Sequence, residues 1–159
     1  MRAKPHTCTG CPAEHYGIGF VPPTTPPSVR WVVVGQGPGE QEVLFEESFY
    51  PQAPSGRMLR GWLAEAGIPE DQVSFGNVVW CWLPKTRINH ELGKGSREPT
   101  AAEAEHCWRV HTKPWLEALP PTAPLLAVGA PAARKLLGLE PGASTENLTG
   151  ITHYQEIPS

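Results

Sequence analysis

Four cysteines, at positions 8, 11, 81 and 107, constrain this chain more than any other feature of its sequence. Cys8 and Cys11 form a C-x2-C pair, whereas Cys81 and Cys107 stand alone and far along the chain. In a reducing compartment, this pattern favours thiolate ligation of a metal over structural disulfides. Zinc and an iron–sulfur cluster both fit, and the alternative is that Cys81 and Cys107 are ordinary buried thiols. We favour a metal, because it would also fasten the N-terminal arm to the rest of the fold.

Apolar runs alternate with helical patterns behind that arm. Residues 1–28 are rich in Pro, Thr and Gly without periodicity, which predicts an irregular arm. We expect strands over 30–35, 73–80 and 124–129, and helices over 55–67, from 99 onward and over 130–137. Thr100 can cap the second helix, and the first has an apolar face for the sheet made of Met58, Leu59, Trp62, Leu63 and Ala66. This alternation predicts a right-handed parallel α/β sheet with a reactive site at the carboxyl ends of its strands.

Length and composition are typical of a single folded domain that spans residues 1–159. The chain is 40% hydrophobic and 18% charged, unlike a disordered protein. A net charge of −3 excludes a strongly basic nucleic-acid-binding protein, so any contact with DNA must be local. The N-terminus lacks the apolar run of a signal peptide, and no stretch approaches the roughly 18 apolar residues of a membrane span. We therefore expect a cytoplasmic protein with no membrane partner.

A glycine-rich loop, Gly35-Gln-Gly-Pro-Gly-Glu-Gln-Glu42, directly follows the first expected strand. Its glycines can bring backbone amides close to a ligand, but taken alone the loop is equally well explained as a plain strand-to-helix turn. Four further motifs follow in order: Ser55-Gly-Arg-Met-Leu59, Asn77-Val-Val-x-Cys81 with Pro84, Arg97-x-Pro-Thr100 with Glu103 and Cys107, and Leu126-Ala-Val-Gly129 with Ala132. Together with the cysteines, over about residues 8–138, they resemble family 4 of the uracil-DNA glycosylases.

This resemblance implies a fold, a cofactor and an activity. The fold is a three-layer α/β sandwich around a short central parallel sheet, with the N-terminal arm stapled by a 4Fe-4S cluster on the four cysteines. The activity is excision of uracil, or another deaminated base, from DNA in base-excision repair, with the base flipped out of the helix. In that reaction Asn77 would read the base, Phe49 or Tyr50 would stack on it, and Gly35, Gln36 and Gly37 would form the loop beside it. Zinc at the cysteines is the less expected alternative.

The sequence departs from the family in two places. Gln36 replaces a glutamate that helps to position water, and Gly37 stands where family 1 enzymes have an aspartate after their glutamine. The family also ends its pocket with a His-Pro-Ser-like motif, whereas this chain stops at Ser159 soon after His153. His153 is either a displaced substitute or an ordinary tail residue. We therefore expect a domain that is truncated or completed by another subunit, and Gln36 and Asn77 are the candidate catalytic residues.

The loop between Pro84 and Pro99 is the candidate DNA contact. It carries Lys85, Arg87, Lys94 and Arg97 together with Asn89 and His90, and these side chains either grip phosphates or are merely solvated. His90 also matches, as a minor hypothesis, the reactive histidine of DNA-crosslinking relatives. His111 and Trp115 look structural. The rivals to a glycosylase are a catalytically degenerate iron–sulfur module that binds DNA or a replication or repair protein, and a zinc-stapled α/β domain without a DNA role.

Overall fold

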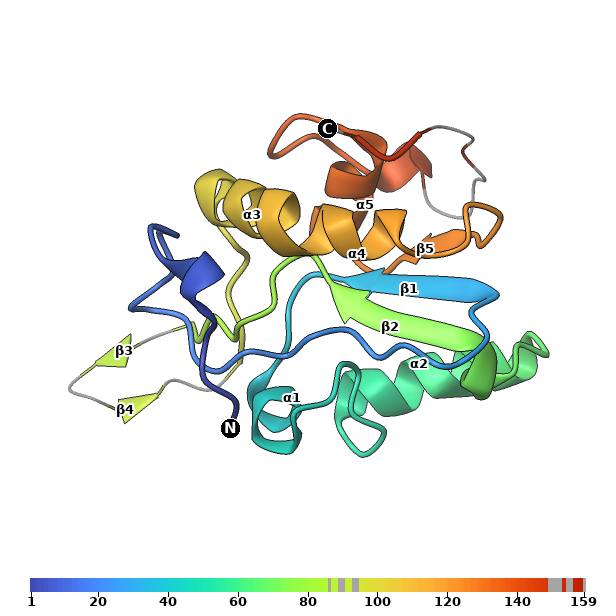
Figure 1. Ribbon diagram of the computed structural model, residues 1–159, viewed down its shortest axis with the longest axis horizontal. Coiled ribbons are helices and arrows are strands. Elements are labelled where there is room, and N and C mark those ends of the chain that lie inside the picture. The colour runs from blue at the N-terminus through green and yellow to red at the C-terminus, as the bar shows by residue number, and fades with distance from the viewer. Residues whose placement is uncertain (86, 89–90, 93–94, 149–152, 154–155, 159) are drawn as a thin grey trace.

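A three-stranded parallel sheet lies at the centre of the protein in a computed structural model (Figure 1). The structure describes residues 1–85, 87–88, 91–92, 95–148, 153 and 156–158, with only the backbone for 87–88 and 91–92. The strands are β1 (Trp31–Gly35), β2 (Val73–Asn77) and β5 (Leu125–Ala127), in the order β2-β1-β5. Both β2 and β5 run parallel to β1. The predicted parallel α/β sheet is therefore confirmed.

Helices cover both faces of this sheet. The helices are α1 (Glu40–Phe45), α2 (Pro54–Glu65), α3 (Ala101–Cys107), α4 (Lys113–Glu117) and α5 (Ala130–Leu137), with a π-helical turn η3 (Trp108–Thr112) between α3 and α4. Short 3-10 turns are η1 (His6–Cys8), η2 (Glu70–Gln72) and η4 (Glu146–Leu148), and a two-stranded hairpin consists of β3 (Arg87–Ile88) and β4 (Glu91–Leu92). Figure 1 shows α1 and α2 on one side of the sheet and α3, α4 and α5 on the other. No helix in the described ranges is long and apolar enough to cross a membrane.

The buried valines of β1 supply core to both layers. Val32 and Val34 belong to a cluster on the side of α3–α5 that includes Trp108, whereas Val33 belongs to the cluster that contains Leu59 of α2. All three valines have no exposed surface. A strand buried on both faces needs such a continuous apolar run, and this is why the run predicted a parallel strand.

The structure differs from the sequence-based expectations in local detail, and the strand expected over 124–129 is only Leu125–Ala127. The second strand ends at Asn77 instead of residue 80, because the amides of Val78 and Val79 turn to bond the carbonyls of Gly35 and Gln36 at 2.9 and 3.1 Å. Helix α1 was not expected. On α2, Leu59 and Leu63 are buried, but Met58 and Trp62 are 51% and 53% exposed. The helix therefore packs through a narrow row of residues four apart rather than through a wide apolar face.

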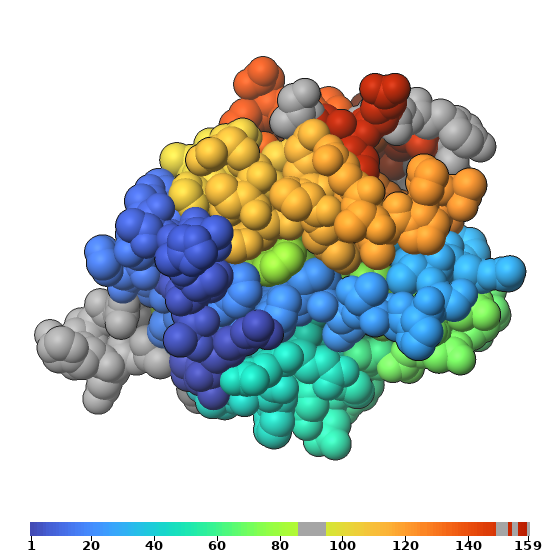
Figure 2. Space-filling model, viewed as in Figure 1, coloured from blue at the N-terminus to red at the C-terminus, as the bar shows by residue number. Residues whose placement is uncertain are grey.

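The N-terminal arm is held partly by backbone hydrogen bonds. Ile18 and Trp82 exchange two such bonds, at 2.8 and 2.9 Å, and the Val21 amide donates to the Trp80 carbonyl at 2.7 Å. Figure 2 shows the arm between α3 and α1 at one end of the molecule. From residue 18 onward the arm is thus tied to the segment after β2 without help from a metal.

Candidate active site and metal centre

Gly35, Asn77 and Phe49 meet at the carboxyl end of the sheet. Gly35 and Asn77 end β1 and β2 and are register partners. A Cβ atom placed on Gly35 would lie 2.5 Å from Asn77 Oδ1 and 2.6 Å from Phe49 Cζ. Only glycine therefore fits at position 35, because the amide of Asn77 and the ring of Phe49 already press against its backbone.

The buried Asn77 has a fixed backbone and a free amide. Its carbonyl accepts hydrogen bonds from Trp80 Nε1 at 3.0 Å and from Thr112 Oγ1 at 3.3 Å, and the residue is only 4% exposed. Within the part of the chain that the structure describes, nothing hydrogen-bonds the side-chain amide of Asn77. An amide can donate and accept at once, so a side chain placed here without a hydrogen bond of its own is suited to an incoming polar ligand.

Phe49 is held in an unusual backbone conformation. Its φ angle is 51°, in the left-handed region that bulky residues seldom adopt, and such strain is concentrated at functional sites. Arg60 stabilises this conformation by donating from Nη2 to the Phe49 carbonyl at 2.9 Å. The approach of α2 is equally close, since a side chain at Gly56 would collide with the carbonyl oxygens of Phe49 and Tyr50.

The two candidate stacking rings have different neighbours. Tyr50 stacks on Phe45 with ring centres 4.3 Å apart and planes inclined by 9°. Phe49, which is 7% exposed, faces Gly35 and Asn77. Of the two aromatic residues proposed from the sequence, Phe49 is the one that lies beside the Asn77 amide.

Gln36 is engaged in a hydrogen bond that a glutamate could not make. Its Nε2 donates to the Arg97 carbonyl at 3.0 Å, and an ionised carboxylate has no proton to donate there. The neighbouring Gly37 has room for a side chain, because an added Cβ would find its nearest atom, the Val79 carbonyl oxygen, at 3.6 Å. The loop is thus anchored by Gln36 and sterically open at Gly37.

Arg97 belongs to a network at the start of α3. Its Nη1 and Nη2 donate to the two carboxylate oxygens of Glu103 at 2.8 and 2.7 Å. Glu103 also accepts from the Thr100 amide at 2.8 Å, and Thr100 Oγ1 accepts from the Glu103 amide at 3.2 Å, so the predicted Thr100 cap is confirmed as a capping box. The hydrogen bonds from Arg97 hold the pKa of Glu103 below its ordinary value.

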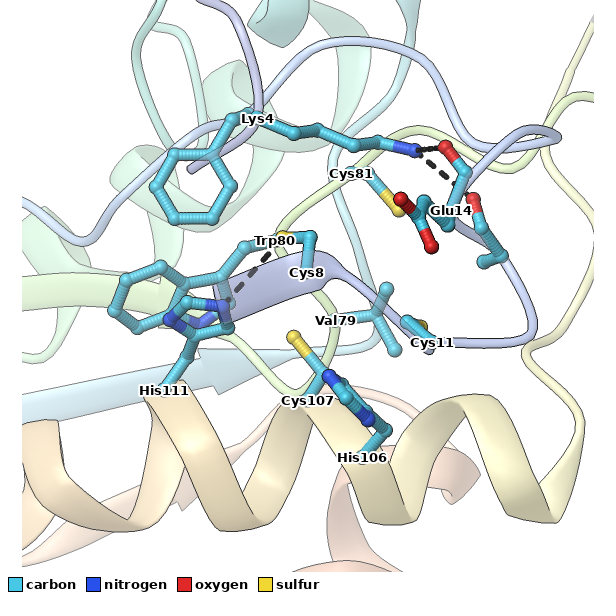
Figure 3. Close-up of a pocket in the computed structure, with 12 residues that line it drawn as sticks. Lys4, Cys8, Cys11, Glu14, Val79, Trp80, Cys81, His106, Cys107 and His111 are labelled. Atoms are coloured by element: carbon cyan, nitrogen blue, oxygen red, sulfur yellow. Dashed lines mark hydrogen bonds between the residues drawn. The ribbon is translucent and has the colours of Figure 1, made fainter. Parts of the chain in front are cut away.

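All four cysteines line one cavity beside the arm (Figure 3). Cys8 and Cys11 come from the arm, Cys81 follows β2 and Cys107 ends α3, and all four are free thiols. Burial raises the pKa of Cys8, Cys81 and Cys107, that of Cys81 to about 11. In the absence of a metal these three thiols keep their protons at neutral pH. A metal that binds to their sulfur atoms must therefore displace these protons.

The spacing of the thiols bears on which metal group fits. Among the described residues, no three Cys, His, Asp or Glu side chains are grouped so that they could hold a single metal ion. A zinc ion would need its sulfurs about 2.3 Å from the metal, and hence roughly 3.8 Å from one another. In a four-iron cluster each thiolate binds a different iron, so the sulfurs stand farther apart around a larger group. The structure shows that all four cysteines share one cavity, which leaves room for a metal group between them.

Several residues around this cavity were not singled out as functional from the sequence. Gly17 has no room for a side chain, because an added Cβ would lie 2.5 Å from Cys81 Sγ. Lys4 Nζ donates to the carbonyls of Ala13 and Glu14 at 2.9 and 2.6 Å and folds the arm over the cysteines (Figure 3). His111 also lines the cavity, and its spacing could have indicated this from the sequence. It follows Cys107 by four residues, which is expected to place both side chains on one side of a helix.

Of the candidate DNA contacts Lys85, Arg87 and His90, one has its side chain within the described residues. Lys85 is exposed, and its amide donates to the Gly95 carbonyl at 3.1 Å at the base of the hairpin. Arg87 has its backbone in β3, but its side chain and the whole of His90 lie outside the described residues. His153 is exposed and lines a groove between β5 and α5.

The sequence matches a known protein family over most of its length. A family model described as "Uracil DNA glycosylase superfamily" matches residues 22–157. The chain belongs to the uracil-DNA glycosylase superfamily. The match covers the glycine loop and Asn77, but it begins after Cys8 and Cys11 and so does not bear on the metal site.

Curated relatives narrow the family. The chain is 29% identical over 133 residues to the type-4 uracil-DNA glycosylase of Archaeoglobus fulgidus, a match that covers 84% of this chain and 60% of that protein. It is 36% identical over 80 residues to the type-4 uracil-DNA glycosylase of Thermotoga maritima, covering 50% of this chain and 41% of that protein. The predicted resemblance to family 4 uracil-DNA glycosylases is therefore confirmed, although the chain spans less than two thirds of the length of either relative.

Proposed function

We propose that this chain excises uracil, or another deaminated base, from DNA as the first step of base-excision repair. The observation that carries the proposal is the amide of the buried residue Asn77, which makes no hydrogen bond within the described residues and lies beside the Gly35 backbone and the Phe49 ring. An amide can donate and accept at once, as reading the Watson–Crick edge of a flipped base requires. The Phe49 ring supplies a stacking face.

The proposed reaction is hydrolysis of the bond between the base and deoxyribose. Water adds its oxygen to C1′ of the sugar, the bond from C1′ to the base nitrogen breaks with its electron pair leaving on the base, and the proton that the water loses is balanced by protonation of the departed base. Negative charge therefore develops on the base oxygens, where hydrogen-bond donors such as the Asn77 amide stabilise the transition state. The amide oxygen of Gln36 is available to orient the water, because its nitrogen is already bonded to the Arg97 carbonyl.

A 4Fe-4S cluster on Cys8, Cys11, Cys81 and Cys107 is the second part of the proposal. Its support is the common cavity that the four thiols line. The cluster would bind four thiolates and thereby join the arm to the end of α3; we assign it no step in the reaction. We further propose that Lys85, Arg87 and His90 contact the DNA, with the two cationic residues at its phosphates.

A catalytically degenerate iron–sulfur module that binds DNA, or a replication or repair protein, is the alternative function. It is favoured by the Gln36 side chain, which is tied to the Arg97 carbonyl and cannot act as a general base. Gly37 adds no carboxylate of its own. An excision assay on uracil-containing DNA separates the two functions.

The test is excision of uracil from single-stranded DNA by Asn77→Ala and by wild-type protein. Loss of one preorganised donor to a developing charge should slow excision on the order of a hundredfold or more. Visible absorption and melting temperature should stay close to those of the wild type, since the Asn77 backbone is held by Trp80 and Thr112.

Asn147→Ala is the matched control, because Asn147 is an exposed amide in η4. It should excise uracil at the wild-type rate. Wild-type activity in Asn77→Ala would show that another residue reads the base. No excision by the wild-type protein, combined with binding to the same DNA, would leave the degenerate binding module as the function.

A further inference from the structure

Two histidines line the cysteine cavity, and one of them is within hydrogen-bonding distance of a sulfur. His106 is the last residue but one of α3, and its Nε2 bonds the backbone carbonyl of Thr7 at 3.0 Å. His111 lies in the π-helical turn η3, and its Nε2 is 3.6 Å from Cys8 Sγ (Figure 3). The same cavity thus contains a histidine that faces a proposed cluster ligand and a neighbouring histidine that faces backbone.

The His111 ring is fixed on both sides. It stacks on Trp80 at 5.0 Å between ring centres, with planes inclined by 27°, and meets Phe20 edge-on at 5.2 Å. The turn that carries His111 is anchored by the next residue, since Thr112 Oγ1 donates to the Val78 carbonyl at 2.9 Å. The contacts of the ring with Trp80 and Phe20 therefore direct Nε2 at Cys8. Turns of π-helix such as η3 are frequent at functional sites.

The chemistry decides which group donates. A cysteine that binds iron is a thiolate and has no proton, so the hydrogen between Cys8 Sγ and His111 Nε2 must be on the nitrogen. Thr7 Oγ1, 3.4 Å from the same nitrogen, can orient its own hydroxyl to suit. Hydrogen bonds to cluster sulfurs stabilise the additional negative charge of the reduced state and thereby raise the reduction potential.

We propose that His111 donates a hydrogen bond from Nε2 to the thiolate of Cys8 and raises the reduction potential of the cluster. His111 is then a residue that tunes the metal group without binding it. The proposal rests on the cluster part of the proposed function and is independent of excision activity.

The test uses anaerobically reconstituted full-length protein whose iron content and visible absorption have been measured. The variants are His111→Phe, which keeps a ring between Trp80 and Phe20 without the donor, His111→Gln, which restores a donor, and the matched control His106→Phe. The midpoint potential is measured by voltammetry. We expect a more negative potential in His111→Phe, recovery in His111→Gln, and a wild-type value in His106→Phe.

A second measurement leaves His111 unchanged, so it works even if the His111 variants fail to bind the cluster. In His106→Phe protein labelled with 15N-histidine, pulsed electron paramagnetic resonance of the reduced cluster should detect a histidine nitrogen through the hydrogen bond. A missing coupling, or His111→Phe with an unchanged potential, would overturn the role of His111 while the cluster stands. Wild-type protein that takes up no iron would overturn the cluster and this inference together.

Discussion

At the scale of single residues, the candidate base pocket depends on how closely three backbone segments approach one another. Gly35 contacts both the Asn77 amide and the Phe49 ring, and Phe49 keeps a left-handed backbone. Two glycines of the same loop differ in this respect. At Gly35 other side chains occupy the space that a Cβ atom would need, whereas at Gly37 that space is empty. This difference makes them a matched pair.

Gly35→Ala should reduce both stability and activity, and Gly37→Ala should reduce neither by much. A methyl group at position 35 would overpack the site, which typically costs about 1–3 kcal/mol of unfolding free energy. It would also displace Asn77 or Phe49, and misplacement by about 1 Å can slow a reaction on the order of a hundredfold. Urea unfolding and the excision rate measure the two effects. Equal behaviour of the two variants would mean that the close packing at Gly35 is not required.

At the scale of elements, the start of α3 connects the glycine loop with the cysteine cavity. Gln36 bonds the Arg97 carbonyl, Arg97 pairs with Glu103, and α3 then continues to Cys107 at its end. Arg97 also lies over the Tyr16 ring at 4.6 Å, and the Tyr16 hydroxyl donates to the Pro84 carbonyl. The segment from Arg97 to the end of α3 therefore bonds Gln36 of the glycine loop at its start and carries Cys107 of the cavity at its end.

Glu103→Gln should destabilise the protein at neutral pH by about 2 kcal/mol, because Arg97 would lose its partner in a largely buried pair. The pKa of Glu103 is lower in the folded protein than its ordinary value of 4.5, so the folded state releases this proton more readily than the unfolded chain does. The stabilisation from the pair is therefore complete above about pH 4.5 and is lost as the pH falls through the lowered pKa. Unfolding free energies of variant and wild type should converge in that acidic range.

Glu98→Gln is the control for this pair. Glu98 has 65% of its side chain exposed and lies 3.9 Å from Arg134, so its removal should change the unfolding free energy by less than about 1 kcal/mol at any pH. A difference between Glu103→Gln and wild type that stays constant through the acidic range would rule out the titration of Glu103 as its cause.

At the scale of the whole molecule, the two parts of the arm are held in different ways. From residue 18 onward, backbone hydrogen bonds join it to the segment after β2. The part before residue 18 contains Cys8 and Cys11 and contacts the fold around the cysteine cavity. The single domain over residues 1–159 and the cytoplasmic location stay predictions.

Removal of iron by a chelator should loosen only the first part of the arm. Amide hydrogen exchange should accelerate at Cys11, Glu14 and Gly17, on the order of tenfold or more, because the cluster would no longer restrain them. The amides of Ile18 and Val21 should stay protected by their bonds to the Trp82 and Trp80 carbonyls. Mass spectrometry of exchange before and after chelation measures both sets, and faster exchange in both would mean that the whole arm depends on the metal.

Local patterns in the sequence determined much of this fold. The apolar run before Gly35 predicted a buried parallel strand, Thr100 predicted a capped helix, and the helix expected over 130–137 matches α5. These features depend on neighbours along the chain: the period of apolar residues, a cap within one turn, a glycine after a strand. The joint order of the motifs also predicted the family.

Only the tertiary structure decided which side chains meet. It placed Phe49, and not Tyr50, beside Asn77, tied Gln36 to the Arg97 carbonyl, and turned His111 towards Cys8. Each of these contacts joins segments far apart in the sequence, so no local period or spacing encodes it. The exposure of Met58 and Trp62 has the same origin, because the width of a helix's buried face is set by the surface against which it packs.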